Sequence, residues 1–190
     1  MANSDAPRGL MPARYVSGGY YDGAVNKYFV PASDGNAIYK GGLVKFAGDA
    51  DADGIPTVTG NVATGDAVVG VVVAVEPVDR SSTIYREAST DRYVMVADSP
   101  DILFECQEDG AMTSAEVGNV ADLTGFTAGN ATTGLSSMEI SSATATAAGD
   151  GTEDVLIVRL AQREDNEIGT NANWLVRLNN HAFVDGNTGA

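Results

Sequence analysis

The hydrophobic pattern is strongest in residues 65–77, the longest apolar run of the chain, which has turn residues at both ends. Its six valines are β-branched, and such side chains favour the pleated geometry of a strand over a helix. Apolar residues occupy both faces of this predicted strand, so we expect other parts of a sandwich or barrel to cover both. Gly70, in its middle, predicts a bulge, a bend or the close approach of another backbone.

Shorter apolar and alternating runs predict further strands before and after this one. They cover residues 26–31, 43–46, 83–87, 91–97, 102–107, 154–161 and 173–179. Pro100 and the aspartates at both ends of the turn 98–101 favour a tight turn, so we expect 91–97 and 102–107 to pair as a hairpin. Seven to nine short strands with many glycines predict an all-β protein, a single β-sandwich or barrel domain.

The domain limits follow from the segments between the strands. Residues 1–24 combine irregularly spaced apolar anchors with two prolines, which predicts an extended N-terminal arm that lies on its own domain or on a neighbour. We expect the β domain to cover 25–184. Within it, 124–151 is an insertion rich in Gly, Ala, Ser and Thr with little value for the core. Residues 185–190 predict a loose C-terminal tail.

The charge of the chain narrows the classes of partner. Eleven Lys and Arg against 26 Asp and Glu give a formal net charge of −15. Phosphate groups repel such a surface, so we expect neither a nucleic-acid partner nor an anionic membrane. The first residues lack a basic segment followed by an apolar one, and no apolar run is long enough to cross a bilayer. We therefore expect a soluble protein made in the cytoplasm.

Candidate chemistry is sparse in this sequence. The one cysteine, Cys106, excludes an internal disulfide framework and lies in an apolar run, which favours a small buried side chain. The one histidine, His181, has no second histidine for a metal site, and we interpret it as a surface or strand-end residue. Asp49, Asp51 and Asp53 resemble the first half of a calcium loop, but the second half is missing. We therefore favour an acidic turn over a calcium site, and cation binding stays open. We expect no enzyme and no cofactor.

Several segments resemble the structural cement, or decoration, proteins of tailed bacteriophage heads. They are MANSDAPRGL at 1–10, VGVVV at 69–73, STIYR at 82–86, residues 91–105, QREDNEIG at 162–169 and WLVRLNNH at 174–181. The resemblance covers most of the chain except 124–151. It implies an all-β virion protein that binds the outer face of an assembled capsid in many copies and braces neighbouring major capsid proteins. It implies no catalytic residues.

Partner-binding residues are predicted in two groups. The apolar and aromatic anchors of the arm are expected to bind the capsid: Leu10, Met11, Tyr15, Tyr20 and Tyr21. Arg159, Arg163 and Arg177 fall within or beside the last two predicted strands, and we expect them to meet acidic groups of a neighbouring subunit in a homo-oligomer, a trimer or a dimer. The alternative function is a carbohydrate- or receptor-binding β-module of a phage tail or fibre, which exposed aromatic platforms would indicate.

Overall fold

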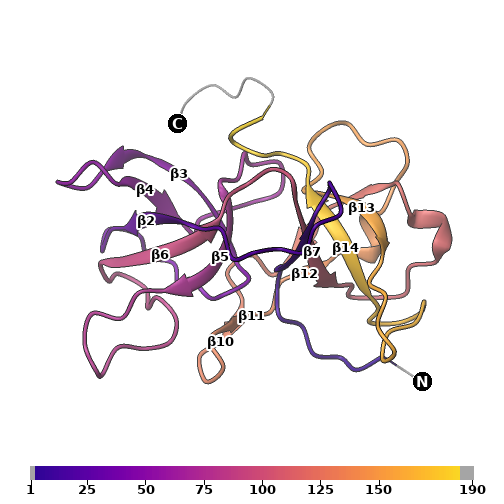
Figure 1. The fold of residues 1–190 in the computed structure, drawn as a ribbon, viewed down its shortest axis with the longest axis horizontal. Coiled ribbons are helices and arrows are strands. Elements are labelled where there is room, and N and C mark those ends of the chain that lie inside the picture. Colours follow the sequence, from indigo (N-terminus) through magenta and orange to yellow (C-terminus); the bar gives the residue numbers. More distant parts are fainter. Residues whose placement is uncertain (1–2, 185–190) are drawn as a thin grey trace.

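The computed structural model describes residues 3–184, which fold almost entirely into β-strands. Figure 1 shows two lobes side by side, a closed five-stranded barrel and a lobe built on an open five-stranded sheet. Residues 3–184 contain no α-helix, and their helical turns are the 3-10 segments η1 (Ser114–Glu116) and η2 (Ser142–Thr144). The predicted all-β class is confirmed.

The barrel lobe closes on itself, so each of its strands has a neighbour on both sides. Around the barrel the order is β2 (Asn26–Val30), β4 (Pro56–Thr59), β3 (Leu43–Ala50), β5 (Gly70–Val75) and β6 (Arg92–Ala97). The contact between β2 and β4 is parallel, and the other pairs are antiparallel. Closure leaves no open sheet edge on which another strand could pair.

The sheet lobe is an antiparallel arrangement with two short strand pairs beside it. Its main sheet has the order β1 (Met11–Tyr15), β7 (Ile102–Gln107), β14 (Asn173–Leu178), β13 (Val155–Leu160) and β8 (Val120–Ala121). The short pairs are β9 (Leu123–Thr124) with β12 (Glu139–Ile140), and β10 (Gly129–Asn130) with β11 (Leu135–Ser136). Trp174 and Phe104 lie fully buried in the core of this lobe.

Strand β5 belongs to the barrel but contributes to both hydrophobic cores. Val69 and Val72 point into the barrel, whereas Val71 packs in the core of the sheet lobe. The prediction that both faces of this strand are covered is confirmed. Gly70 allows the close approach that its position predicted, because a Cβ atom there would lie 2.3 Å from the carbonyl oxygen of Ala97 on β6.

The predicted hairpin of residues 91–97 with 102–107 is wrong. Strand β6 pairs with β2 and β5 in the barrel, whereas β7 pairs with β1 and β14 in the sheet lobe. The turn 98–101 therefore carries the chain from one lobe to the other. Asp98 anchors this crossing, because its carboxylate accepts hydrogen bonds from Asn26 Nδ2 at 2.9 Å and Tyr28 Oη at 2.7 Å.

Two segments expected to lie outside the core take part in it. In residues 1–24, β1 pairs with β7 at the edge of the main sheet, and Leu10 is fully buried. In the insertion 124–151, Met138 and Ile140 are fully buried in the sheet lobe. The arm thus lies on its own domain, and the insertion contributes to the core through Met138 and Ile140, two of its few large apolar residues. The predicted tail 185–190 lies outside the described residues.

Candidate partner-binding surface

The outer face of the main sheet carries leucines and arginines in rows that run across β7, β14 and β13. One row consists of Leu103, Arg177 and Leu156, and the next consists of Glu105, Leu175 and Arg159. We call these six residues the arginine face. Leu103 and Leu175 are 5% and 6% exposed although they belong to neither core. The methylene stems of arginine are suited to covering apolar side chains of this kind.

A β-bulge in β13 places Arg159 on this face. Ile157 pairs with Val176 and points into the core, and Arg159 pairs with the next residue along, Leu175, because the register shifts between them. Simple alternation would have turned Arg159 inward with Ile157. The bulge therefore keeps a guanidinium out of the core and adds it to the outer face.

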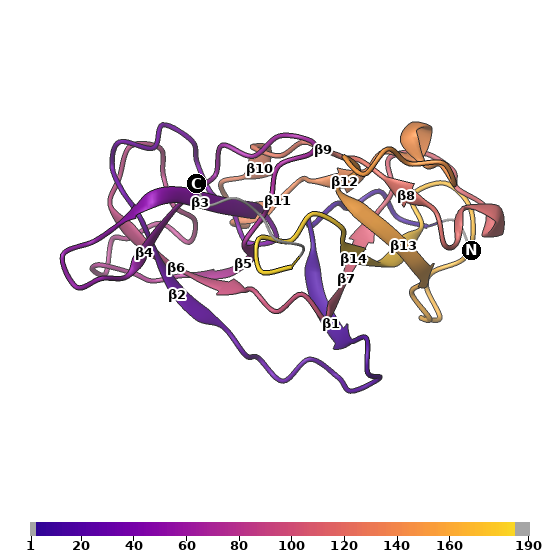
Figure 2. The ribbon, with the colours of Figure 1, turned by 90° about the horizontal axis from the view of Figure 1, so that it is seen from above.

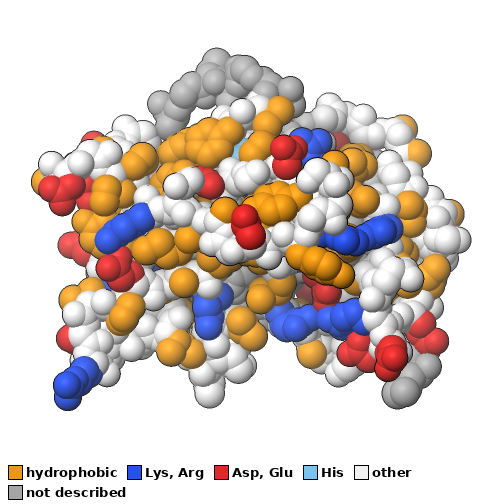
Figure 3. Space-filling model, viewed as in Figure 1, with side chains coloured by type: hydrophobic (Ala, Val, Ile, Leu, Met, Phe, Trp, Pro, Cys, Tyr) orange, Lys and Arg blue, Asp and Glu red, His pale blue; other side chains and the backbone are white. Residues whose placement is uncertain are grey.

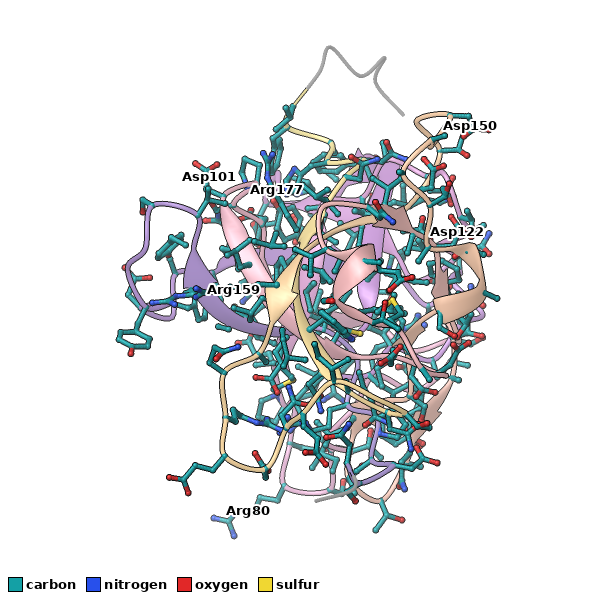
Figure 4. All side chains as sticks on the ribbon, turned by 90° about the vertical axis from the view of Figure 1, so that its right-hand side faces the viewer. Arg80, Asp101, Asp122, Asp150, Arg159 and Arg177 are labelled. Carbon is teal, nitrogen blue, oxygen red and sulfur yellow. The ribbon has the colours of Figure 1, made fainter. Side chains whose placement is uncertain are left out.

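Arg159 and Arg177 form no ion pair within residues 3–184. Arg177 Nε donates to the carbonyl oxygen of Pro100 at 3.0 Å, and Arg159 is exposed. Figure 4 shows both side chains projecting to the same side of the sheet lobe. Within residues 3–184 these two guanidiniums therefore lack carboxylate partners, although the whole chain has a net charge of −15.

Arg163 differs from these two because it is engaged within its own chain. Its Nη1 donates to Oε1 of Glu105, and its Nε donates to Oδ1 of Asp165 at 3.1 Å. Arg8 Nη2 donates to the same Glu105 oxygen at 3.0 Å. The guanidinium of Arg163 thus already lies between two carboxylates of its own chain, and its expected contact with a neighbouring subunit stays a prediction.

A cleft of about 750 Å³ opens beside this group of charges. Arg8, Arg163 and Asp165 line it together with amide and hydroxyl side chains, and its lining includes no aromatic residue. The two arginines are balanced by Glu105 and Asp165. The charges at the cleft are thus balanced, and the cleft lacks the aromatic surface on which a sugar ring would stack.

The five arm residues expected to bind the capsid have different environments. Leu10 fills the core of the sheet lobe and cannot reach a partner without unfolding. Met11, Tyr15 and Tyr21 are half-buried, and Tyr20 is 83% exposed. Tyr20 is therefore the member of this group whose side chain is presented to solvent.

Tyr20 lies on an ordered turn that projects beside β1. Tyr15 N donates to Gly19 O at 2.8 Å, and Tyr21 N donates to Ala13 O at 3.2 Å, so the returning segment pairs with the edge strand. Figure 2 shows this segment standing out from the body of the protein before the chain enters β2. We call residues 14–22 the aromatic turn.

Side-chain contacts fix the aromatic turn further. The guanidinium of Arg14 lies 5.2 Å from the centre of the Tyr20 ring. The rings of Tyr15 and Tyr21 are 6.1 Å apart, and the Tyr15 hydroxyl donates to Asp22 Oδ1 at 2.7 Å. That hydrogen bond is the main reason why the pKa of Tyr15 is raised to about 12. The turn is thus held in one conformation while Tyr20 stays exposed.

Cys106, His181 and Asp51 take part in the packing and hydrogen bonding of the fold. Cys106 is buried, as predicted, and burial raises the pKa of its thiol. His181 follows the end of β14 but is only 3% exposed, and its Nδ1 accepts from the backbone N–H of Phe183 at 3.2 Å. Asp51 accepts from the N–H groups of Asp53 and Ile55, which makes it an Asx turn. Residues 3–184 contain no group of three or more side chains suited to a metal ion.

Figure 3 shows basic side chains among apolar ones on the side of the molecule that carries the arginine face and the aromatic turn. Among the described residues, no helix has the length and hydrophobicity needed to span a membrane. Comparison of the chain with protein-family models, curated proteins and solved structures gave no match.

Proposed function

We propose that this chain is a non-enzymatic structural protein of a bacteriophage virion. It attaches to the outer surface of the assembled head and braces neighbouring copies of the major capsid protein. The resemblance of its segments to cement proteins supports this function. The single structural observation that carries it is the aromatic turn, in which Tyr20 is 83% exposed on a segment fixed by hydrogen bonds.

The composition of the aromatic turn suits attachment to another protein. Tyrosine and arginine are enriched among the residues that dominate binding energy at protein interfaces, and Arg14 lies over Tyr20 here. Val16, 55% exposed, adds an apolar side chain to the same turn. Because the turn is already ordered, little conformational entropy is lost when it binds. It therefore serves as a rigid anchor between capsid subunits.

The charge of the protein supports a position outside the shell. A net charge of −15 opposes contact with packaged DNA, whose phosphates carry the same sign. On the outer surface this charge keeps the free protein soluble before it attaches. The proposed location is therefore the outer capsid surface, after synthesis in the cytoplasm of the host.

The sugar-binding alternative receives less support from the described residues. Tyr20 and Phe183 are their exposed aromatic side chains, and they lie in different lobes: Tyr20 beside β1, and Phe183 against Phe46 of β3. A carbohydrate platform needs aromatic rings that present their faces to one ligand. Two separated rings do not form such a platform.

Co-sedimentation with expanded heads tests the proposal. The wild-type protein should pellet with assembled heads and not with unassembled coat protein. Tyr20→Ala combined with Val16→Ser should weaken binding to heads about tenfold or more, since such anchors carry much of the binding energy. Val78→Ser is the matched control, because Val78 is 75% exposed on the barrel lobe. Equal pelleting of the turn variant and the control would contradict attachment through the aromatic turn, and wild type that stays in the supernatant would contradict the function itself.

A further inference from the structure

The sheet lobe carries opposite charges on opposite sides. Figure 4 shows Arg159 and Arg177 projecting to one side, while Asp122 and Asp150 lie toward the other. Asp122 follows β8 at the edge of the main sheet, and Asp150 lies in the loop before β13. We call Asp122 and Asp150 the acidic side.

The acidic side lacks a basic partner of its own. Neither Asp122 nor Asp150 forms an ion pair within residues 3–184. Burial and the nearby carboxylates of Glu153 and Asp150 raise the pKa of Asp122, so negative charges crowd at this place. A cation supplied by another molecule would relieve that repulsion.

We propose that the arginine face of one copy of this chain binds the acidic side of a second copy, with Arg159 and Arg177 opposite Asp122 and Asp150. The observation that selects a second copy is charge complementarity, because the chain itself carries both halves of the contact. The half-buried Leu156, which pairs with Arg177 and lies on the same strand as Arg159, adds apolar area to the arginine face. Contacts that combine charge with apolar area gain specificity from the first and affinity from the second.

The position of the two surfaces determines the symmetry of the contact. Because they lie on opposite sides of one lobe, each copy uses its arginine face toward one neighbour and its acidic side toward another. Such a head-to-tail contact forms a closed ring or an open row, and it does not form a twofold dimer. The contact uses residues outside the aromatic turn, so it goes beyond the proposed attachment and does not depend on it.

Sedimentation velocity of the full chain at low ionic strength tests this contact. We expect the wild type to self-associate as its concentration rises, and to dissociate in high salt because exposed charges are screened. Arg159→Glu with Arg177→Glu, or Asp122→Arg with Asp150→Arg, should weaken self-association roughly tenfold or more, since like charges then face each other. The protein carrying all four substitutions should regain it, because the charges are exchanged between the two halves.

Arg80→Glu is the matched control for charge. Arg80 is exposed and lies apart from Arg159 and Arg177 in Figure 4. The Arg80→Glu variant changes the net charge by the same amount per substituted residue, but outside the proposed contact. Its self-association should therefore match that of the wild type. A wild type that stays monomeric to about millimolar concentration, or a fourfold variant that does not recover, would overturn the proposal. Binding to heads is measured separately, so loss of head attachment with intact self-association rejects the proposed function alone.

Discussion

The barrel lobe and the sheet lobe deal differently with unpaired strand edges. The barrel has no open edge, because β2 closes it against β4 and β6. The main sheet keeps two edges, which the chain covers locally: residues 19–21 pair with β1, and Thr146 pairs with Val120 of β8. Both candidate surfaces belong to the open lobe. The barrel is thus a closed support, while the open sheet carries the groups for which we propose partner contacts.

The carboxylates of the two lobes also differ. In the barrel, burial tends to raise the pKa of Asp34, but hydrogen bonds from the N–H groups of Asn36 and Gly60 outweigh it and the pKa is lowered. In the sheet lobe, burial dominates for Glu108 and Asp154, and their pKa values are raised. The surroundings of Asp34 in the barrel lobe therefore favour its charged form, whereas those of the buried Glu108 and Asp154 in the sheet lobe disfavour theirs.

The largest expected effect comes from a charge inside the barrel. Val72→Asp would bury an unpaired carboxylate, which costs at least several kcal/mol, a large part of the stability of a domain. Trp174, the one tryptophan, reports on the other lobe because it lies in the sheet-lobe core. Because β5 contributes to both cores, we expect its fluorescence to shift to that of exposed tryptophan. Native emission in this variant would show that the lobes fold independently.

The next effect separates the buried and exposed parts of the N-terminal segment. Leu10→Ala should lower the free energy of unfolding by about 2–5 kcal/mol, because it leaves a cavity in the sheet-lobe core. Tyr20→Ala should change it by less than about 0.5 kcal/mol, because Tyr20 is exposed. Urea unfolding measures both. Similar losses would contradict the division of this segment into a core part and a partner-binding part, and a large loss for Leu10→Ala would show that residues 1–24 cannot be deleted without cost.

A smaller effect tests the close approach of β5 and β6. Gly70→Ala would place Cβ 2.3 Å from the Ala97 carbonyl oxygen, so the strands must move apart at a cost of about 1–3 kcal/mol. Gly35→Ala is the control, since its backbone does not adopt a positive φ and nothing lies within 4 Å of a Cβ atom there. Thermal unfolding should show a lower midpoint for Gly70→Ala than for Gly35→Ala. Equal midpoints would mean that β5 and β6 can separate freely.

The smallest expected effect is a different pH response of the two lobes. The raised pKa of Asp154 contributes stability that is present below its ordinary value, near 4, and is lost as pH rises through the folded value. The lowered pKa of Asp34 contributes stability that is present above its ordinary value and is lost as pH falls through the lower folded value.

Acidification from pH 7 toward 4 should therefore strengthen the sheet lobe before it weakens the barrel. Amide hydrogen exchange of Val176 and Val96, corrected for the intrinsic rate, measures the two lobes separately. Asp154→Asn should flatten the response of Val176 and leave that of Val96 unchanged. Parallel responses of both amides in the wild type would contradict the comparison.

The sequence predicted most of the barrel because its strands follow local patterns. The valines of residues 68–75 alternate between the two cores, and Tyr28, Val30, Val94 and Val96 point into the barrel at a period of two. The pairing of these strands was harder to predict. The turn 98–101 has the composition of a hairpin, but β6 and β7 separate because long-range partners in two different sheets outweigh a local turn preference.

The arginine face was only partly visible in the sequence. Arg177 follows the alternation of β14, and its position between Val176 and Leu178, which point into the core, marks it as outward-facing. Arg159 departs from the alternation of β13, because the bulge after Ile157 turns its side chain to the outer face. No residue type in this strand predicts that bulge. The pairing of Glu105 with Arg8 and Arg163 could not be predicted from the sequence, because the paired residues are 97 and 58 positions apart.

The crossings between the lobes determine how the protein responds to tension. The chain passes from the sheet lobe to the barrel through residues 16–25 and returns through 98–101. A third connection forms where the segment after β14 reaches the barrel, with Ala182 N donating to Val68 O at 2.8 Å and Val68 N donating to Asn180 O at 2.9 Å. Tension applied across the lobes is divided among these connections in parallel, so the two lobes stretch as one elastic body and neither separates before a core opens.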